Sequence, residues 1–193
     1  DATHVPVGDD QKQHLELCRD IAQKFNNDYA IDNFLKVPDP LIQKQFSRIM
    51  SLKDGKKKMS KSEPSDLSRI NLTDDENSII NKIKKAKTDP LPLPSNVEEL
   101  ETRHEAKNLL GIYSSLTDLT LDQSIKEFSG KNFSEFKKNL SDLVVEKISP
   151  ISNEINKLKK NNDFIDDVLR DGAAKADVIS SKKVEEMKKI IGF

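Results

Sequence analysis

The chain has 193 residues, of which 34% are charged and 35% hydrophobic, with a formal net charge of -1. This length predicts one or two domains with a sizeable core, and the near-neutral charge argues against a generally basic nucleic-acid binder. No apolar run approaches the length needed to cross a bilayer. Cys18 is the single cysteine, which excludes an internal disulfide and favours a reducing compartment.

The first region has an α/β pattern. His4–Val7 is short and β-branched and ends at Gly8, which predicts a buried strand followed by a turn that faces a ligand. We expect a helix from about Asp10 to Phe25, capped by Asp9 or Asp10. A strand, a glycine turn and a helix in this order are typical of the crevice where open α/β sheets bind ligands. The apolar stripe of this helix comprises Leu15, Leu17, Cys18, Ile21, Ala22 and Phe25.

A second short strand, Ile49–Leu52, is predicted to lead into a loop over Asp54–Pro64 that carries the string Lys58-Met59-Ser60-Lys61-Ser62. Two lysines three residues apart supply compact charges suited to phosphate. The serine hydroxyls and free backbone N–H groups add donors for the phosphate oxygens. The alternative is a solvated lysine run, but a chance match to this string is on the order of one in a thousand. The loop therefore predicts a site for the polyphosphate of a nucleotide.

From Thr73 onward the pattern is helical, with repeated helix-start signals. Thr73–Glu76, Ser95–Glu98 and Thr120–Gln123 each have the form of a capping box, and Gly130 follows the third helix. Pro90–Pro94 is predicted to be a stiff, extended connector between helices. We expect the aliphatic stripes of all these helices to form the core.

Three further helices are predicted towards the end of the chain. The first carries apolar residues from Phe133 to Ile148, and Pro150 should break or kink it before the stripe continues. The other two are expected at about Phe164–Arg170 and Ala173–Ile191, separated at Gly172.

Two motifs resemble those of a known enzyme family. Lys58–Ser62 looks like the KMSKS signature of class I aminoacyl-tRNA synthetases, and Val5–Leu17 resembles the VPVGxDQxxHxEL segment of tryptophanyl-tRNA synthetases. Ser47–Leu52 lies between them as in that family, and Leu169–Ala176 resembles its LxxGAxKA tail. The resemblance covers nearly the whole chain and is weakest from Pro90 to Glu105.

The resemblance implies a Rossmann-like α/β nucleotide-binding portion over residues 1–72, ending with the KMSKS loop, and an all-α, anticodon-side domain over residues 73–193. It implies activation of tryptophan with ATP and Mg²⁺, and transfer to tRNA(Trp) through tryptophanyl-adenylate, by a homodimer. The chain begins at Asp1 and lacks a HIGH-type motif. We therefore expect it to be the C-terminal half of a synthetase, inactive by itself.

The resemblance also assigns roles to residues. Val5 and Val7 would line the tryptophan pocket, and Gln11 would contact the amino acid. Asp9 stands where the family usually has Glu, and helix capping is the alternative role for Asp9 and Asp10. Catalytic contacts with phosphate are expected from Lys58, Ser60, Lys61 and Ser62. ATP would be contacted by Gly8, Asp9, Asp10, Ile49, Lys58, Met59, Ser60, Lys61 and Ser62.

Two other functions and two compartments stay open at this point. A tyrosyl-tRNA synthetase has a related loop, and a non-catalytic helical RNA-binding module could descend from a synthetase. The mitochondrial matrix is expected from the divergent segment between Pro90 and Glu105, with the bacterial cytoplasm as the alternative.

Local lysine clusters are the candidates for contact with RNA, although each is also typical of a solvated helix face. No metal site is expected, because the histidines lack ligand spacing and one cysteine cannot complete a zinc site. The clusters are Lys82-Lys84-Lys85-Lys87, Lys137-Lys138 and Lys157-Lys159-Lys160, and the histidines are His4, His14 and His104.

Overall fold

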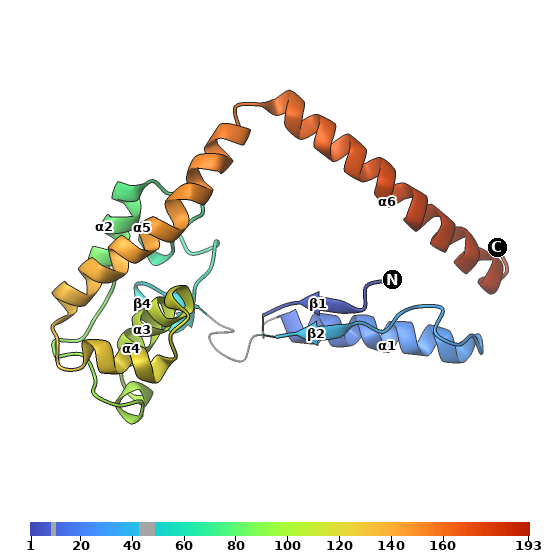
Figure 1. Ribbon diagram of the computed structural model, residues 1–193. Coiled ribbons are helices and arrows are strands. Elements are labelled where there is room, and N and C mark those ends of the chain that lie inside the picture. The colour runs from blue at the N-terminus through green and yellow to red at the C-terminus, as the bar shows by residue number, and fades with distance from the viewer. Residues whose placement is uncertain (9–10, 43–48) are drawn as a thin grey trace. The chain divides into compact units, whose positions relative to one another are not determined.

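The computed structural model describes residues 1–8, 11–42 and 49–193 (Figure 1). The chain divides into two compact units, and each is described by itself below. The first unit comprises Asp1–Gln43 and Leu158–Phe193, and the second comprises Lys44–Lys157.

The first unit pairs a small parallel sheet with helices. Strand β1 (His4–Pro6) lies beside β2 (Asp39–Leu41), with His4 opposite Asp39. Two helices, α1 (Lys12–Asp28) and α6 (Asn162–Ile191), complete the unit. β1 confirms the first predicted strand, but the predicted burial is wrong, because His4 and Pro6 are exposed on a sheet of only two short strands.

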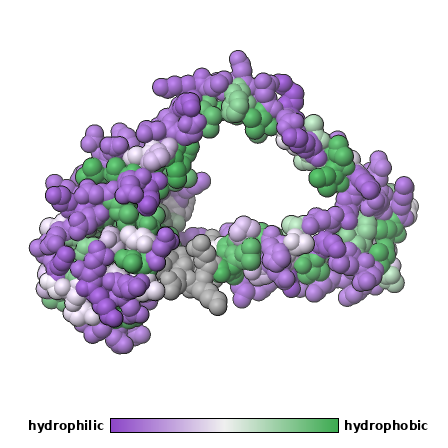
Figure 2. All heavy atoms as spheres, in the orientation of Figure 1, coloured by the Kyte–Doolittle hydropathy of each residue, from purple (hydrophilic) through white to green (hydrophobic). Residues whose placement is uncertain are grey.

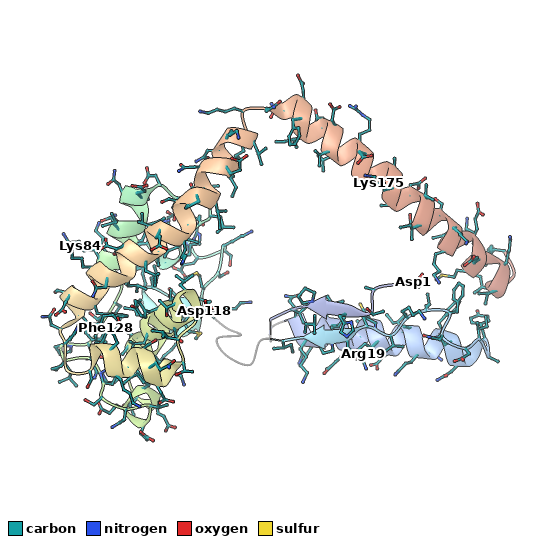
Figure 3. All side chains as sticks on the ribbon, in the orientation of Figure 1. Asp1, Arg19, Lys84, Asp118, Phe128 and Lys175 are labelled. Carbon is teal, nitrogen blue, oxygen red and sulfur yellow. The ribbon has the colours of Figure 1, made fainter. Side chains whose placement is uncertain are left out.

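Polar side chains of helix α1 contact the segment that leads into β2. Arg19, labelled on α1 in Figure 3, binds Asp39 through Nη1 and Oδ1 at 2.6 Å and also donates to the carbonyl of Pro38. Asn26 exchanges two hydrogen bonds with the backbone of Leu35, at 2.8 and 2.9 Å. The predicted apolar stripe is therefore partly wrong. Leu15 and Ala22 are buried, whereas Leu17 and Ile21 are 59% and 58% exposed.

The second unit contains a short antiparallel hairpin and a helical bundle. The hairpin is formed by β3 (Met50–Ser51) and β4 (Asp54–Lys58). The core gathers aliphatic and aromatic side chains from the helices of this unit, and Phe128 lies among them (Figure 3). Its aromatic pairs include Phe128–Phe136 and Tyr113–Phe128, with ring centroids 4.8 and 4.9 Å apart. The helical elements are η2 (Asp66–Ser68), α2 (Glu76–Lys84), η3 (Glu98–Glu101), α3 (His104–Thr117), α4 (Leu121–Phe128) and α5 (Phe133–Leu158).

The three predicted helix starts have different outcomes. The capping box at α4 is confirmed, since Thr120 accepts from the Gln123 N–H and the Gln123 side chain accepts from the Thr120 N–H. The box at Thr73 is wrong, because α2 is capped two residues later by Asp75, which accepts from the Ser78 N–H at 2.7 Å. Ser95–Glu98 leads into the short 3₁₀-helix η3 rather than into α3, which begins separately at His104.

The two predicted helix breaks do not occur, while the kink given as the alternative at Pro150 stays a prediction. Helix α5 runs through Pro150, which is exposed, as is Glu146, the residue four positions earlier whose carbonyl loses its partner. Water can hydrate that carbonyl, so the proline is tolerated. Helix α6 runs through Gly172, where the backbone stays helical.

Helix α6 buries none of its residues. Val178 and Ile179 are 73% and 68% exposed, and Figure 2 shows apolar atoms at the surface along this helix. The expectation that all aliphatic stripes form the core is therefore wrong for α6. No helix in the described ranges is both long and apolar enough to span a membrane.

Candidate nucleotide-binding site

The Lys58–Ser62 string begins on a strand and continues into a turn. Lys58 is the last residue of β4 and lies opposite Met50 of β3, and the Met59 N–H donates to the Ile49 carbonyl at 3.0 Å. The predicted loop over Asp54–Pro64 is therefore wrong in its first half, because β3 supplies a pairing partner up to Lys58. Beyond Met59 the chain turns, and the Glu63 N–H donates to the Ser60 carbonyl at 3.4 Å.

The turn after β4 brings two hydroxyls together. The Oγ atoms of Ser60 and Ser62 lie 2.8 Å apart, and the Ser62 N–H donates to Ser60 Oγ at 3.3 Å. A hydroxyl can donate one hydrogen, so when one serine donates to the other, the second still has a hydrogen to offer. Lys61 is exposed in the same turn. One short turn thus supplies a cation and a hydroxyl donor, which are the groups that bind an anion.

A pocket of about 500 Å³ adjoins this turn. Arg69 is one of its walls, and its guanidinium donates to the Glu63 carbonyl at 2.9 Å and to Asn71 Oδ1 at 3.2 Å. Arg69 is not among the residues predicted from the sequence, because it lies on an irregular segment without a recognisable period. The pocket is lined by Met59, Ser60, Lys61, Arg69, Ile70, Asn71, Leu72 and Thr73.

The turn between β3 and β4 is fixed to the helical part of the unit by backbone hydrogen bonds. The Leu52 N–H donates to the Ser68 carbonyl at 2.9 Å, and the Lys87 N–H donates to the Leu52 carbonyl at 2.7 Å. Lys87 also pairs with Glu105, with Nζ and Oε1 2.9 Å apart. The Lys87 hydrogen bond lowers the pKa of Glu105 below 4.5, although burial opposes this, and the same bond raises the pKa of Lys87 above 10.5.

One lysine of the predicted RNA-binding clusters is buried. Lys82 is 3% exposed, and its Nζ lies 2.6 Å from Asp66 Oδ2 and 2.5 Å from Asp74 Oδ2. The hydrogen bonds from Lys82 and Asn71 lower the pKa of Asp66 below 3.8. The predicted role of Lys82 in RNA contact is therefore wrong, because its charge is already neutralised within the protein.

Lys137 is also engaged by the protein. Its ammonium donates to the carbonyls of Lys84 and Ala86, at 3.2 and 2.5 Å, and satisfies acceptors at the end of α2. Burial lowers the pKa of Lys137 below 10.5. Lys84 itself is exposed (Figure 3), so it remains a candidate for contact with RNA.

The residues predicted to contact tryptophan lie in the first unit. The Val7 N–H donates to the Leu41 carbonyl at 3.2 Å, which extends the β1–β2 pairing towards Gly8. The Gln11 N–H donates to the Gly8 carbonyl at 3.0 Å. Gln11 Oε1 lies 3.0 Å from His14 Nδ1. Val5, Val7 and Gly8 are half-buried, and Gln11 is exposed.

Some of the other predicted site residues lie in the second unit, and the rest lie outside the described residues. Asp9 and Asp10, and Ser47 and Arg48 of the family-like segment, lie outside the described residues. Ile49, Met59 and the four predicted catalytic residues belong to the second unit. Among the described residues, no group of three or more His, Cys, Asp or Glu side chains is arranged to hold a metal ion.

Comparison with known proteins gives a consistent picture. The family described as tRNA synthetases class I (W and Y) matches residues 1–150. The tryptophan--tRNA ligase of Mesorhizobium japonicum is 50% identical over 210 aligned residues, covering 100% of this chain and 59% of that protein.

Two solved structures are also similar. Tryptophanyl-tRNA synthetase from Mycoplasma pneumoniae superimposes with a TM-score of 0.81 at 28% identity, covering 98% of this chain and 56% of that one. The enzyme from Campylobacter jejuni, complexed with ADP and tryptophan, gives a TM-score of 0.68 at 26% identity, covering 99% and 57%. The chain thus spans a little over half the length of the proteins it matches.

Proposed function

The chain belongs to the class I tRNA synthetases for tryptophan and tyrosine, and we propose that it is part of an enzyme that joins tryptophan to tRNA(Trp). The observation that carries this is the Lys58–Ser62 string, which leaves β4 as a turn beside a pocket. The chain is 50% identical over its whole length to a tryptophan--tRNA ligase, which supports tryptophan as the amino acid.

The complete enzyme would use ATP, as its magnesium complex, as a substrate. The tryptophan carboxylate attacks the α-phosphorus, pyrophosphate leaves, and the resulting tryptophanyl-adenylate passes its acyl group to the tRNA. Negative charge spreads over the phosphate oxygens during the first step, so positioned cations and donors accelerate it. We assign this stabilisation to Lys58, Lys61 and the hydroxyls of Ser60 and Ser62.

The remaining ligand contacts follow the same proposal. Gly8 would let the turn backbone approach the nucleotide, with Asp9 and Asp10 beside it, and the backbones of Ile49 and Met59 would frame the adenine. Gln11 would contact the amino acid, and Val5 and Val7 would line its side-chain pocket. The similarity to a synthetase solved with ADP and tryptophan supports both ligand classes.

The organisation of the whole protein is also a proposal. Residues 1–72 would complete the class I nucleotide-binding domain and residues 73–193 would form the anticodon-side domain, within a homodimer that binds tRNA(Trp). The relative and the two solved enzymes named above are bacterial, which supports the bacterial cytoplasm. The expected mitochondrial location has no support from these relatives.

Tryptophan-dependent exchange of pyrophosphate into ATP by the complete enzyme tests this function. Lys61→Ala should lower kcat by about a hundredfold, because it removes a charge-assisted contact made mainly in the transition state, and tryptophan binding should change little. The control is Lys57→Ala, which removes an exposed lysine of β4 whose Nζ lies 3.9 Å from Asp54.

Three results would contradict parts of the proposal. Exchange driven by tyrosine instead of tryptophan would move the enzyme to the tyrosyl branch. Absence of exchange with both amino acids would favour a non-catalytic RNA-binding module. A Lys61→Ala enzyme as active as Lys57→Ala would remove Lys61 from the site.

A further inference from the structure

Strand β3 has one edge that no described strand covers. The Met59 N–H donates to the Ile49 carbonyl, and the neighbouring pair is Met50 with Lys58. In an antiparallel pair, hydrogen-bonded and non-hydrogen-bonded positions alternate, so the N–H and C=O of Met50 point away from β4. Met50 is half-buried, so its backbone N–H and C=O are partly shielded from water and need hydrogen-bond partners within the protein.

The side chain of Asn108 supplies both partners. Its Oδ1 accepts from the Met50 N–H at 3.0 Å, and its Nδ2 donates to the Met50 carbonyl at 2.9 Å and to the Ser51 carbonyl at 3.3 Å. A carboxamide has the same donor and acceptor as a peptide unit, so Asn108 takes the place of a third strand. Asn108 lies on α3 and is 8% exposed, so water does not readily replace these bonds.

The second strand of the hairpin meets the same helix. A Cβ on Gly55 would lie 2.6 Å from the carbonyl carbon of His104 and 2.7 Å from the Glu105 nitrogen. The backbones of β4 and the first turn of α3 therefore touch, which only glycine permits. Asn108 holds one strand and Gly55 lets the other approach, so the hairpin has a defined position on α3.

We propose that Asn108 is a positioning residue for the Lys58–Ser62 turn. It acts through Met50, whose partner across the hairpin is Lys58, the first residue of the string. The Met59 N–H donates to the carbonyl of Ile49, the residue before Met50, so a shift of Met50 on α3 is passed through this hydrogen bond to the start of the turn. This inference rests on the proposed function, because the consequence of misplacing the turn is read from adenylate formation.

The experiment compares two variants of one helix in the complete enzyme. Asn108→Ala removes the partners that the N–H and C=O of Met50 have among the described residues. The control is Ser114→Ala, which removes another buried hydrogen bond of α3, from Ser114 Oγ to the Leu119 carbonyl at 2.5 Å, at 3% exposure. Ser114 contacts neither strand through this bond, so it reports the general cost of losing a buried polar contact in α3.

Asn108→Ala should lower kcat for tryptophan-dependent pyrophosphate exchange by about tenfold or more, since small misplacements of reacting groups are costly. The dissociation constant for tryptophan without ATP should stay within about twofold of wild type, because the turn contacts phosphate and not the amino acid. Ser114→Ala should keep kcat within about twofold even where its Tm falls. Asn108→Asp, which keeps the size and the acceptor but loses the donor, should lower kcat in the same direction.

Wild-type kcat in either Asn108 variant that retains the wild-type circular dichroism spectrum would overturn the inference, as would an equal loss in Ser114→Ala. A wild-type enzyme that exchanges with tyrosine would refute only the proposed amino acid, and Asn108 would then be tested with tyrosine. Absence of exchange with both amino acids would overturn the proposed function and, with it, this inference.

Discussion

Glu105 carries a charge whose effect on stability depends on pH. Its pKa in the folded protein is lowered below 4.5, mainly by the hydrogen bond from Lys87, and the Gly55 N–H contributes in the same direction. A lowered pKa means that the folded state favours the carboxylate. The stabilisation is therefore present above pH 4.5 and is lost as the pH falls through the lowered pKa.

We expect Glu105→Gln to be less stable than wild type at pH 7 and to approach it on acidification below pH 4.5, once the wild-type carboxyl is protonated. Urea unfolding at pH 7 and at successively lower pH measures this difference. Glu98→Gln, at an exposed position on η3, is the control and should follow wild type throughout. A gap for Glu105→Gln that stays constant with pH would show that packing rather than charge is responsible.

At the residue scale, the sequence predicts which residues can bind a ligand more readily than it predicts which side chains form ion pairs or hydrogen bonds within the fold. The Lys58–Ser62 string is recognisable because its residue types and spacing suit phosphate, and they are adjacent in the chain. The prediction for Lys82 is wrong because Asp66 and Asp74 meet it only through folding. Asn108 has no such signal, since it follows the charged Lys107 and meets its partner Met50 only through folding.

Helix α6 offers a test at the scale of one element. Gly172 lies inside it. Apart from the backbone of the helix itself, no atom of the described residues lies within 4 Å of the position that a Cβ would take, so a side chain meets no obstacle there. Gly172→Ala should stabilise the helix locally by about 0.5 to 1 kcal/mol, because alanine loses less backbone entropy than glycine in a helix.

Amide hydrogen exchange of residues 168–176 measures this effect. Protection should rise by about two- to fivefold in Gly172→Ala, which is the same free energy expressed as a ratio. The contrasting variant is Gly130→Ala, where φ is +74° and alanine should destabilise by about 1 kcal/mol. Reduced protection around Gly172 would instead support the helix break that the sequence suggested.

Local signals predict elements unevenly. The Thr120 box is confirmed because its cap and its Gln123 partner meet without a competitor. At α2 the Thr73 pattern is equally good, but the Asp74 carboxylate is drawn into the ion pair with Lys82 and Asp75 becomes the cap. Strand β2 is not predicted at all, since Asp39-Pro40-Leu41 has no strand-like pattern and pairs only because β1 is beside it.

At the scale of the whole chain, burial is concentrated in the second unit. Its hydrophobic core runs from Leu52 to Val144, whereas α6 buries no residue. The class of fold is confirmed by the similarity to a solved tryptophanyl-tRNA synthetase at a TM-score of 0.81. The distribution of burial was beyond sequence reasoning, because an apolar stripe does not reveal whether anything covers it.

This distribution predicts unequal opening within the 193-residue chain. Backbone amides of α3 and of the first half of α5 should exchange at least about a hundredfold more slowly than those in the middle of α6, because opening free energy follows local burial. Hydrogen exchange followed by mass spectrometry of peptic peptides measures all three helices in one experiment. Equal protection of α6 and α3 would show that α6 has a stabilising partner in solution.

The two lysines of the string differ in how far their backbones are already ordered in the folded protein. Lys58 ends β4 opposite Met50, whereas Lys61 lies in a turn whose backbone hydrogen bond, from Glu63 to Ser60, is long at 3.4 Å. In the proposed enzyme, the entropy of ordering Lys61 would be lost at the moment of nucleotide binding, while that of Lys58 was lost on folding. A nucleotide without its terminal phosphates could then bind beside Lys58 at the end of β4 without ordering the turn that carries Lys61.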